Sequence, residues 1–299
     1  MKEREPTAFE IIQAKFETDD ACRDYMFKQR WPGGFICPLC GCREYYLIKK
    51  RHKYQCKNCR YQASVTAGTV MDRSHLPLTI WVWAIFLVAH DKRGISATQL
   101  SRVLNLPYNT SWFLLHRIRH AMAERDSLYK LAGIVELDDT FFGAPRKGGK
   151  RGRGTTKTKV IVALSKDEKG SPQFAKMQVV PDLKGTTIGK FANERIKMGS
   201  EVHTDAYQAY RKPLSAKYWH KYAVFDADTN MLKWLHTVIG NSKSFVLGTF
   251  HGLGKKHLQR YLDEYCYRFN RRHKKDEIFD RLLFAVTQST SLRFSDLIA

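Results

Sequence analysis

Apolar and polar residues follow two different periods along this chain. Residues 8–30 and 76–124 carry apolar side chains at helical spacing, which predicts amphipathic helices in both regions. From Gly133 onward, short runs rich in Val, Ile, Phe or Thr predict β-strands instead, and strands that then alternate with helices are typical of a mixed α/β domain. The strands are expected at residues 134–142, 158–165, 174–180 and 201–205, with a helix near 184–198 and a last clear helix from about His257 to Arg271.

The longest apolar run, Ile80 to Ala89, predicts a buried helix, because it is too short to span a bilayer. The polar N-terminus, MKEREPTAFE, lacks the apolar core of a signal peptide. We therefore expect a soluble protein without a membrane partner, located in the cytoplasm.

The net charge of the chain indicates a polyanionic partner. Its 299 residues include 51 Lys and Arg against 29 Asp and Glu, a formal net charge of +22. Such an excess indicates nucleic acid, whereas a membrane surface would need a basic amphipathic helix or a lipid anchor. A basic segment from Pro145 to Lys159, with seven Lys or Arg and no acid, joins the first two expected strands.

The cysteines predict a metal site. Cys37 and Cys40 form one Cys-x2-Cys pair, and Cys56 and Cys59 form a second pair fifteen residues later. Two such knuckles match a tetrahedral, structural Zn²⁺ site with four thiolates, whereas the alternative is four unrelated buried thiols. Cys42 lies close enough in sequence to compete with Cys40 as a ligand.

The residues around these cysteines predict a zinc ribbon. Tyr45, Tyr46, Leu47 and Tyr54 alternate between the knuckles and would form its strands. Basic side chains surround the ribbon and indicate DNA contacts, although they would also suit protein contacts or simple solvation. They are Lys49, Lys50, Arg51, Lys53, Lys57 and Arg60.

A helix-turn-helix is predicted in the second helical region. Ser96 caps a short helix that ends at Leu104, residues 105–107 break it, and a longer helix covers Trp112 to Ala123. This arrangement is typical of DNA-reading modules, with a plain helical bundle as the alternative. The second helix also carries Arg117, Arg119 and His120.

Three acids in the β-rich region are candidates for metal chemistry. Asp138 and Asp139 lie within one expected strand, where acids are disfavoured, and Asp205 ends another. Carboxylates on neighbouring strands can share hard divalent cations, which serve phosphodiester chemistry. Each acid alone would be an ordinary surface residue, and the basic, DNA-binding character of the chain favours the metal interpretation.

Several runs of residues resemble one known family, the DDE-type transposases of bacterial insertion sequences with an N-terminal zinc ribbon, numbered fifteen ninety-five. The resemblance extends over nearly the whole chain and implies an RNase H-like catalytic core with divalent ions, normally Mg²⁺. The matching runs are Arg30 to Gly33, Val135 to Thr140, Thr204 to Tyr207, Gly248 to Gly252, Lys255 to Glu264 and Tyr267 to Arg272.

The resemblance assigns roles to individual residues. Asp138 and Asp205 match the first and second catalytic aspartates, and Asp139 matches a position that is usually glutamate. The third acid is normally a glutamate seven residues before a lysine. Here Lys243 matches the lysine, for which a phosphate-holding role is expected, and His236 stands where the glutamate would be.

The histidine changes what is expected of the metal site. Imidazole is a softer ligand than carboxylate, which favours Mn²⁺ relative to Mg²⁺. Asp226 and Asp228 lie nearby and offer carboxylates that would partly compensate. A chain inactivated at this position, serving as a transposase-derived DNA-binding regulator, is the alternative to an active transposase.

These observations predict four parts and a set of partners. The parts are an N-terminal helical segment (1–30), a zinc ribbon (31–65), a helix-turn-helix region (76–125) and an RNase H-like catalytic domain (131–299). The partners are double-stranded DNA, as terminal inverted repeats and target, and further copies of the chain in a homodimer or larger assembly on DNA. When bound to DNA, the protein is expected at the nucleoid.

Overall fold

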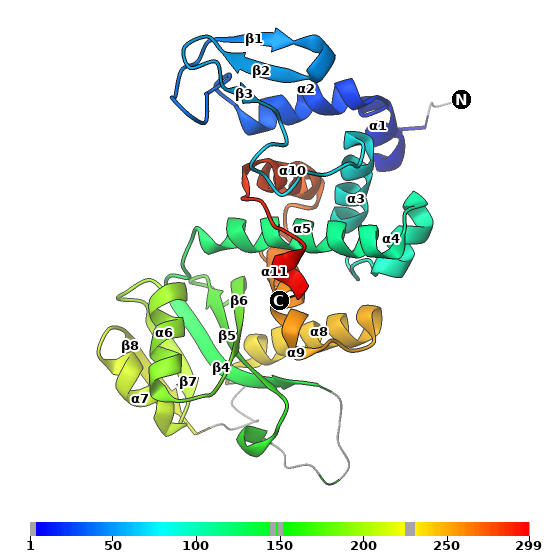
Figure 1. Cartoon of the computed structure of the whole chain (residues 1–299). Helices are drawn as coiled ribbons and strands as arrows, with labels where there is room; N and C mark the ends of the chain where they lie inside the picture. The colour runs from blue at the N-terminus through cyan, green and yellow to red at the C-terminus, as the bar shows by residue number, and fades with distance from the viewer. Residues whose placement is uncertain (1–3, 144–147, 149–151, 225–230, 299) are drawn as a thin grey trace. The chain divides into compact units, whose positions relative to one another are not determined.

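The computed structural model describes residues 4–143, 148, 152–224 and 231–298, whose elements are drawn in Figure 1. The chain divides into two compact units, and each is described by itself. The first unit comprises Met1–Asp91, Ala97–Met122 and Asp276–Ala299, and the second comprises Lys92–Ser96 and Ala123–Lys275.

The first unit begins with the two amphipathic helices expected from the sequence, α1 (Ala8–Lys15) and α2 (Asp19–Arg30). A capping box between Thr7 and Glu10 starts α1, because each side chain accepts a hydrogen bond from the other residue's backbone N–H. Thr18 caps α2 in a similar way by accepting from the Ala21 N–H.

A small antiparallel sheet follows, as predicted for the ribbon. It consists of β1 (Tyr45–Ile48), β2 (Lys53–Cys56) and β3 (Gln62–Ala63) in that order, with a 3-10 turn at Lys49–Arg51 between the first two. Aromatic rings join this sheet to the end of α2 and give the small module an apolar core. They belong to Phe27, Trp31, Phe35, Tyr45 and Tyr54.

The remaining helices of the first unit are α3 (Leu78–His90), α4 (Ala97–Leu104), most of α5 (Tyr108–Ser127), α10 (Ile278–Gln288) and α11 (Ser295–Ile298). The apolar run Ile80 to Ala89 forms most of α3 and is largely buried, as expected. Among the described residues, no helix is both long and apolar enough to cross a membrane.

Two of these helices follow the helix that the sequence predicts to be the last clear element, so that prediction is wrong. α10 packs against α2 and α3, and the Tyr25 hydroxyl donates a hydrogen bond to Asp280 at 2.6 Å. Its buried residues, such as Phe279, Leu282 and Val286, recur at helical spacing. Partners more than 250 positions away in the sequence hold this helix in place.

The second unit is built on a five-stranded sheet. Its strands are β4 (Ile134–Phe142), β5 (Thr158–Lys166), β6 (Pro172–Val180), β7 (Glu201–Asp205) and β8 (Trp219–Ala223). The spatial order is β6-β5-β4-β7-β8, and β5 alone runs opposite to the other strands. This order and these directions are those of the RNase H-like core, and the first four strands lie where the sequence predicts them.

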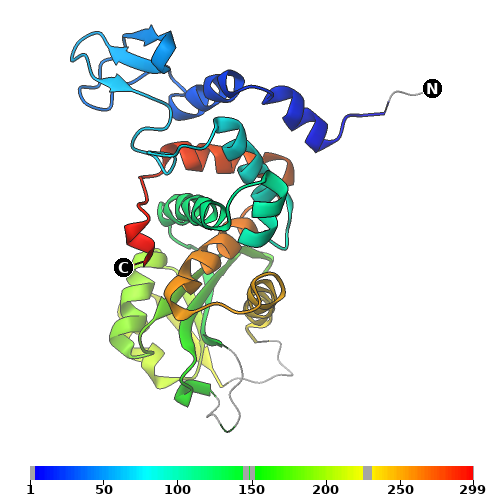
Figure 2. The same cartoon turned by 45° about the vertical axis from the view of Figure 1, so that its right-hand side comes forward.

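Helices cover both faces of this sheet (Figure 2). α6 (Gly185–Arg195) and α7 (Gln208–Ser215) contribute to one apolar core with residues such as Val135, Leu137 and Val202. α8 (Lys233–Phe250) and α9 (Lys255–Phe269) contribute to another on the opposite face, with Phe142, Val160 and Val162. Because side chains alternate along a strand, odd-numbered residues of β4 face α6 and α7, and even-numbered residues face α8 and α9.

Candidate active site and zinc ribbon

The two candidate catalytic aspartates lie on neighbouring parallel strands. Asp138 is at the centre of β4 and Asp205 is the last residue of β7. The register pairs Ile134 with Glu201 and Glu136 with His203. The pairing ends at Glu136 and His203, so Asp138 and Asp205 each lie two residues beyond the same end of the β4–β7 ladder. Val135 and Val202 share one apolar core, so alternation puts the side chains of Asp138 and Asp205 on the opposite face of the sheet.

Asp139 follows Asp138 in the strand, so its side chain points to the opposite face of the sheet. Its carboxylate is almost completely buried and accepts a hydrogen bond from the hydroxyl of Tyr210 on α7 at 3.1 Å. This geometry separates the two adjacent aspartates into different surroundings.

The first turn of α8 places His236 against Asp138. Its Nε2 atom is 3.3 Å from Asp138 Oδ2, and the imidazole is 40% exposed while the carboxylate is 16% exposed. The two side chains therefore meet at the edge of the core, where solvent and ions have access. Lys243 lies two turns further along the same helix, and its side chain is half-buried.

The surroundings of these residues shift two pKa values. The pKa of Asp138 is raised to about 6, chiefly by burial and also by the charges of Asp139 and Asp205, although the Asp139 N–H and the His236 ring lower it. Burial lowers the pKa of Lys243, and the charge of Lys157 lowers it further. A divalent cation beside Asp138 would favour its ionised form, and a phosphate beside Lys243 would favour the charged ammonium.

The structure adds Arg153, a residue whose role the sequence did not reveal. Its guanidinium lies 2.8 Å from Asp139 and 2.9 Å from Asp205, and it stacks on the ring of Tyr207 with 3.8 Å to the ring centre. Burial lowers the pKa of Arg153, but the hydrogen bonds to Asp205 and Asp139 outweigh this effect and raise it above its usual range. The basic character of the 145–159 segment was the one signal that could have indicated such a contact.

Some residues expected near this site lie outside the described part of the chain, and the expected metal ligands are not tightly gathered. Asp226 and Asp228 lie outside the described residues, as does part of the basic segment 145–159. Within the described residues, the one group of at least three His, Cys, Asp or Glu compact enough to hold an ion is the cysteine group. Asp138, Asp205 and His236 are not gathered as tightly, and Asp205 is paired with Arg153.

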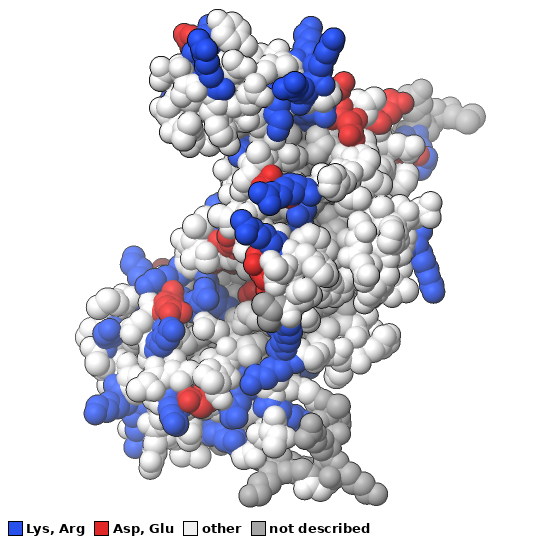
Figure 3. All heavy atoms as spheres, viewed as in Figure 1, with Lys and Arg blue, Asp and Glu red and all other residues white. Residues whose placement is uncertain are grey.

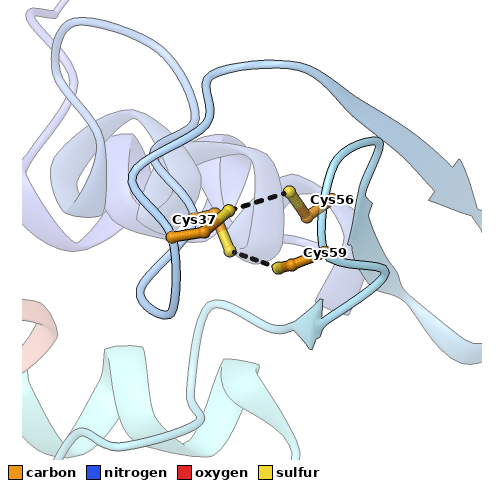
Figure 4. Close-up of side chains that lie close together, drawn as sticks. Cys37, Cys56 and Cys59 are labelled. Carbon is orange, nitrogen blue, oxygen red and sulfur yellow. Dashed lines mark hydrogen bonds between the residues drawn. The ribbon is translucent and has the colours of Figure 1, made fainter.

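The four predicted cysteine ligands do meet at one point in the ribbon. The sulfur atoms of Cys37, Cys40, Cys56 and Cys59 all lie within 4.8 Å of one another, with Cys37 3.5 Å from Cys59 and Cys40 3.5 Å from Cys56 (Figure 4). Tetrahedral zinc with bonds of about 2.3 Å needs sulfur atoms about 3.8 Å apart. The donor set therefore fits a structural zinc ion.

The backbone of the two knuckles explains this convergence. Gly41 donates to the Cys37 carbonyl and Arg60 to the Cys56 carbonyl, each at the residue that follows a knuckle's second cysteine. Both residues are left-handed, with φ of 74° and 59°. Cys42, the possible competitor, accepts from the Glu44 N–H at 3.5 Å and is not part of the group.

The helix-turn-helix region has the predicted order of helix, turn and helix, but two of the basic residues noted on its second helix are buried. α4 and α5 are separated by residues 105–107, as predicted, and α5 is longer at both ends. Arg117 and Arg119 are buried, with Arg117 bound to the Asp72 carbonyl at 3.0 Å. These two arginines therefore give the surface of α5 no charge, and its use in reading DNA remains a prediction.

Comparison with known proteins identifies the two parts of the chain. Residues 17–62 match a transposase zinc-ribbon domain, and residues 130–270 match an ISXO2-like transposase domain. The chain belongs to the family of insertion-sequence transposases that carry these two domains. The second match contains Asp138, Asp205, His236 and Lys243, and the first contains all four candidate zinc ligands.

Some individual proteins are also similar to this chain, at low sequence identity. The chain is 24% identical over 213 residues to an uncharacterized protein in transposable element ISH50 of Halobacterium salinarum, covering 65% of this chain and 70% of that protein. Among solved structures, it is similar to the Mos1 strand transfer complex at 11% identity and a TM-score of 0.27, covering 71% and 78% of the two chains. A pre-cleavage Mos1 transpososome scores 0.26 at 10% identity, covering 69% and 79%.

Proposed function

We propose that this transposase binds the ends of its insertion element and catalyses metal-dependent DNA cleavage and strand transfer. The observation that carries the proposal is the position of Asp138 and Asp205, each two residues beyond the last residue pair of the adjacent parallel strands β4 and β7. His236 lies against the first of these carboxylates. This is a donor set suited to divalent ions such as Mg²⁺ or Mn²⁺.

Each residue has a proposed part in the chemistry. Divalent ions, when bound, would activate the attacking water or hydroxyl and neutralise the leaving oxygen. Asp138 and Asp205 would hold them, with His236 as the third ligand. Lys243 would orient the DNA end by binding a phosphate with its ammonium.

DNA is the proposed partner because of charge as well as family. The net charge is +22, and Lys and Arg side chains lie on both units on the face that Figure 3 shows. We assign recognition of the terminal inverted repeats to the zinc ribbon, with its structural Zn²⁺, and to α4 and α5. A homodimer or larger assembly on DNA, at the nucleoid in the cytoplasm, completes the proposal.

The test is incubation of the protein with the DNA that flanks its own gene, in Mg²⁺ or Mn²⁺, followed by mapping of new 3′-hydroxyl ends. Cleavage at the element ends is expected, and Asp138→Ala or Asp205→Ala should abolish it. Glu168→Ala, an exposed acid of the same unit, is the control and should cleave normally. Specific end binding without cleavage in either metal would contradict the proposal and favour a DNA-binding regulator, with His236 as the inactivating change.

A further inference from the structure

A buried carboxylate next to the candidate ligands has no part in the chemistry proposed above. Glu136 lies on β4 two residues before Asp138, so both side chains occupy the same face of the sheet. It is only 4% exposed. Burying a charge is unfavourable unless the group is paired and hydrogen-bonded, so the partners of Glu136 indicate what it does.

Those partners connect three elements. Glu136 Oε1 accepts a hydrogen bond from Lys166 Nζ on β5 at 2.7 Å, which supplies the counter-charge. Glu136 Oε2 accepts from the backbone N–H of Leu235 at 3.2 Å, within the first turn of α8. We propose that Glu136 is a positioning residue that fixes the first turn of α8 and thereby sets where His236 meets Asp138.

The start of α8 explains why it needs this contact. The first amides of any helix lack acceptors within the helix and are usually satisfied by the side chain of the preceding residue. Here that residue is Leu232, which is left-handed (φ 54°) and caps nothing with its side chain. The carboxylate of Glu136 supplies the acceptor from the sheet, and its negative charge suits the positive end of the helix dipole.

Two successive side chains on one face of β4 contact two successive residues of α8. Glu136 binds Leu235, and the next residue on the same strand face, Asp138, meets the next residue of the helix, His236. A movement of the first turn of α8 would therefore change the distance between the imidazole and the carboxylate. The inference depends on the proposed function in one respect, that His236 is taken as a ligand of the divalent ion.

The test measures Mn²⁺ binding directly, by the electron paramagnetic resonance signal of the free ion, in the full-length protein. Glu136→Met keeps the side-chain length but removes the acceptor, and it should weaken Mn²⁺ binding about tenfold, the usual effect of losing a residue that orients a ligand. Glu136→Gln keeps an oxygen for the Leu235 N–H and should stay within about threefold of the parent.

A double substitution tests whether Glu136 acts through His236. His236→Ala alone should also weaken Mn²⁺ binding about tenfold. If Glu136 works by placing His236, adding Glu136→Met to His236→Ala should cause no further loss. Losses that multiply to about a hundredfold would show independent effects and overturn the inference.

Glu264→Met is the control for a general loss of stability. Glu264 is equally buried in the same unit, and it pairs with Arg268 on its own helix at 2.9 Å. Glu264→Met should lower the melting temperature without changing Mn²⁺ binding, and a loss of Mn²⁺ affinity matching that of Glu136→Met would overturn the inference.

The results also separate this inference from the proposed function. If the parent cleaves DNA but Glu136→Met binds Mn²⁺ normally, only this inference is contradicted. A parent that binds Mn²⁺ with the predicted variant pattern but never cleaves contradicts only the proposed function.

Discussion

The guanidinium of Arg153 lies 2.9 Å from the carboxylate of Asp205, so a residue of the segment between β4 and β5 reaches the end of β7. The same guanidinium is 2.8 Å from Asp139, whose side chain is only 3% exposed. The contact joins the basic segment to the two strands that carry the candidate catalytic aspartates. It also gives Asp139 the counter-charge that its buried position requires.

Arg153→Ala should therefore destabilise the second unit. Asp139 would keep the Tyr210 hydroxyl as its remaining described hydrogen-bond partner. The loss of a charged hydrogen-bond partner by a buried group lowers the free energy of unfolding by about 1–3 kcal/mol. Tyr210→Phe removes a single neutral donor and should cost about 1 kcal/mol. Urea unfolding followed by circular dichroism measures both. An Arg153→Ala protein as stable as the parent would show that the ion pair contributes nothing.

Zinc binding should depend on four of the five cysteines in the ribbon. Cys40→Ser should lose the ion, because a structural site with three thiolates is open and weaker. Cys42→Ser should keep it, since Cys42 contacts Glu44 and lies outside the group. Mass-spectrometric metal analysis of freshly purified protein should give one zinc per chain for the parent and for Cys42→Ser.

Removal of zinc should unfold residues 31–65 and leave the second unit folded, because the ribbon's small core depends on the metal while the sheet has its own. Hydrogen exchange before and after chelation would measure this. Protection in the ribbon that survives chelation would contradict a structural role for the ion.

His236 variants test the third ligand position. Restoring a carboxylate with His236→Glu should keep or raise cleavage in Mg²⁺, because a hard ion prefers oxygen ligands. His236→Ala should lower cleavage in both metals, and the parent should work at least as well in Mn²⁺ as in Mg²⁺. Rates of end cleavage in each metal decide the matter. If His236→Ala cleaves as well as the parent, histidine is not a ligand, and Asp226 or Asp228 becomes the better candidate.

The strands and the cysteine site could be predicted from sequence because local patterns determine them. β4 to β7 contain Val, Ile, Phe or Thr in short runs, and the two knuckles have a fixed spacing. β8 was missed because it is an exposed edge strand with the sequence WHKYA, which has no apolar alternation. α8 was not predicted as a helix, although two of its residues were already candidates.

Local sequence patterns could not predict contacts between segments that are distant in the sequence. The level of Asp138 relative to Asp205 depends on strand register, which is set by the folded sheet. Arg117 and Arg119 were taken as surface charges because arginine is usually exposed, but here both are buried. The role of Glu136 at the start of α8 likewise requires the sheet and the helix to be in place. The boundaries of the four predicted parts remain a prediction.

Asp138 should affect stability and metal binding in opposite directions. Its pKa in the folded protein is raised to about 6, against about 3.9 for an unperturbed aspartate. Folding therefore disfavours its ionised form, so the group lowers stability above pH 6 and stops doing so below about pH 4. Without divalent ions at pH 7.5, Asp138→Asn should be more stable than the parent, by an amount on the order of 2 kcal/mol.

The gain from Asp138→Asn should shrink at pH 5, and added Mn²⁺ should reverse the order by stabilising only the parent. Thermal unfolding at the two pH values measures this. Asp182→Asn is the control with the opposite sign, because the Thr187 hydroxyl and the Lys184 N–H lower the pKa of Asp182. A destabilised Asp138→Asn protein at pH 7.5 without divalent ions would show that the carboxylate is not under electrostatic strain.

Lys243 should contribute to DNA affinity through a single phosphate. Affinity should fall steeply with salt, because each lysine or arginine on a phosphate displaces a condensed counterion. Lys243→Met should weaken binding to all sequences alike and reduce the slope of log affinity against log salt by about one. Lys197→Met is the control, since Lys197 is exposed and precedes the start of β7, at the end of that strand away from Asp205. Fluorescence anisotropy with labelled element ends at several NaCl concentrations gives both slopes. An unchanged slope for Lys243→Met would remove Lys243 from the proposed DNA contacts.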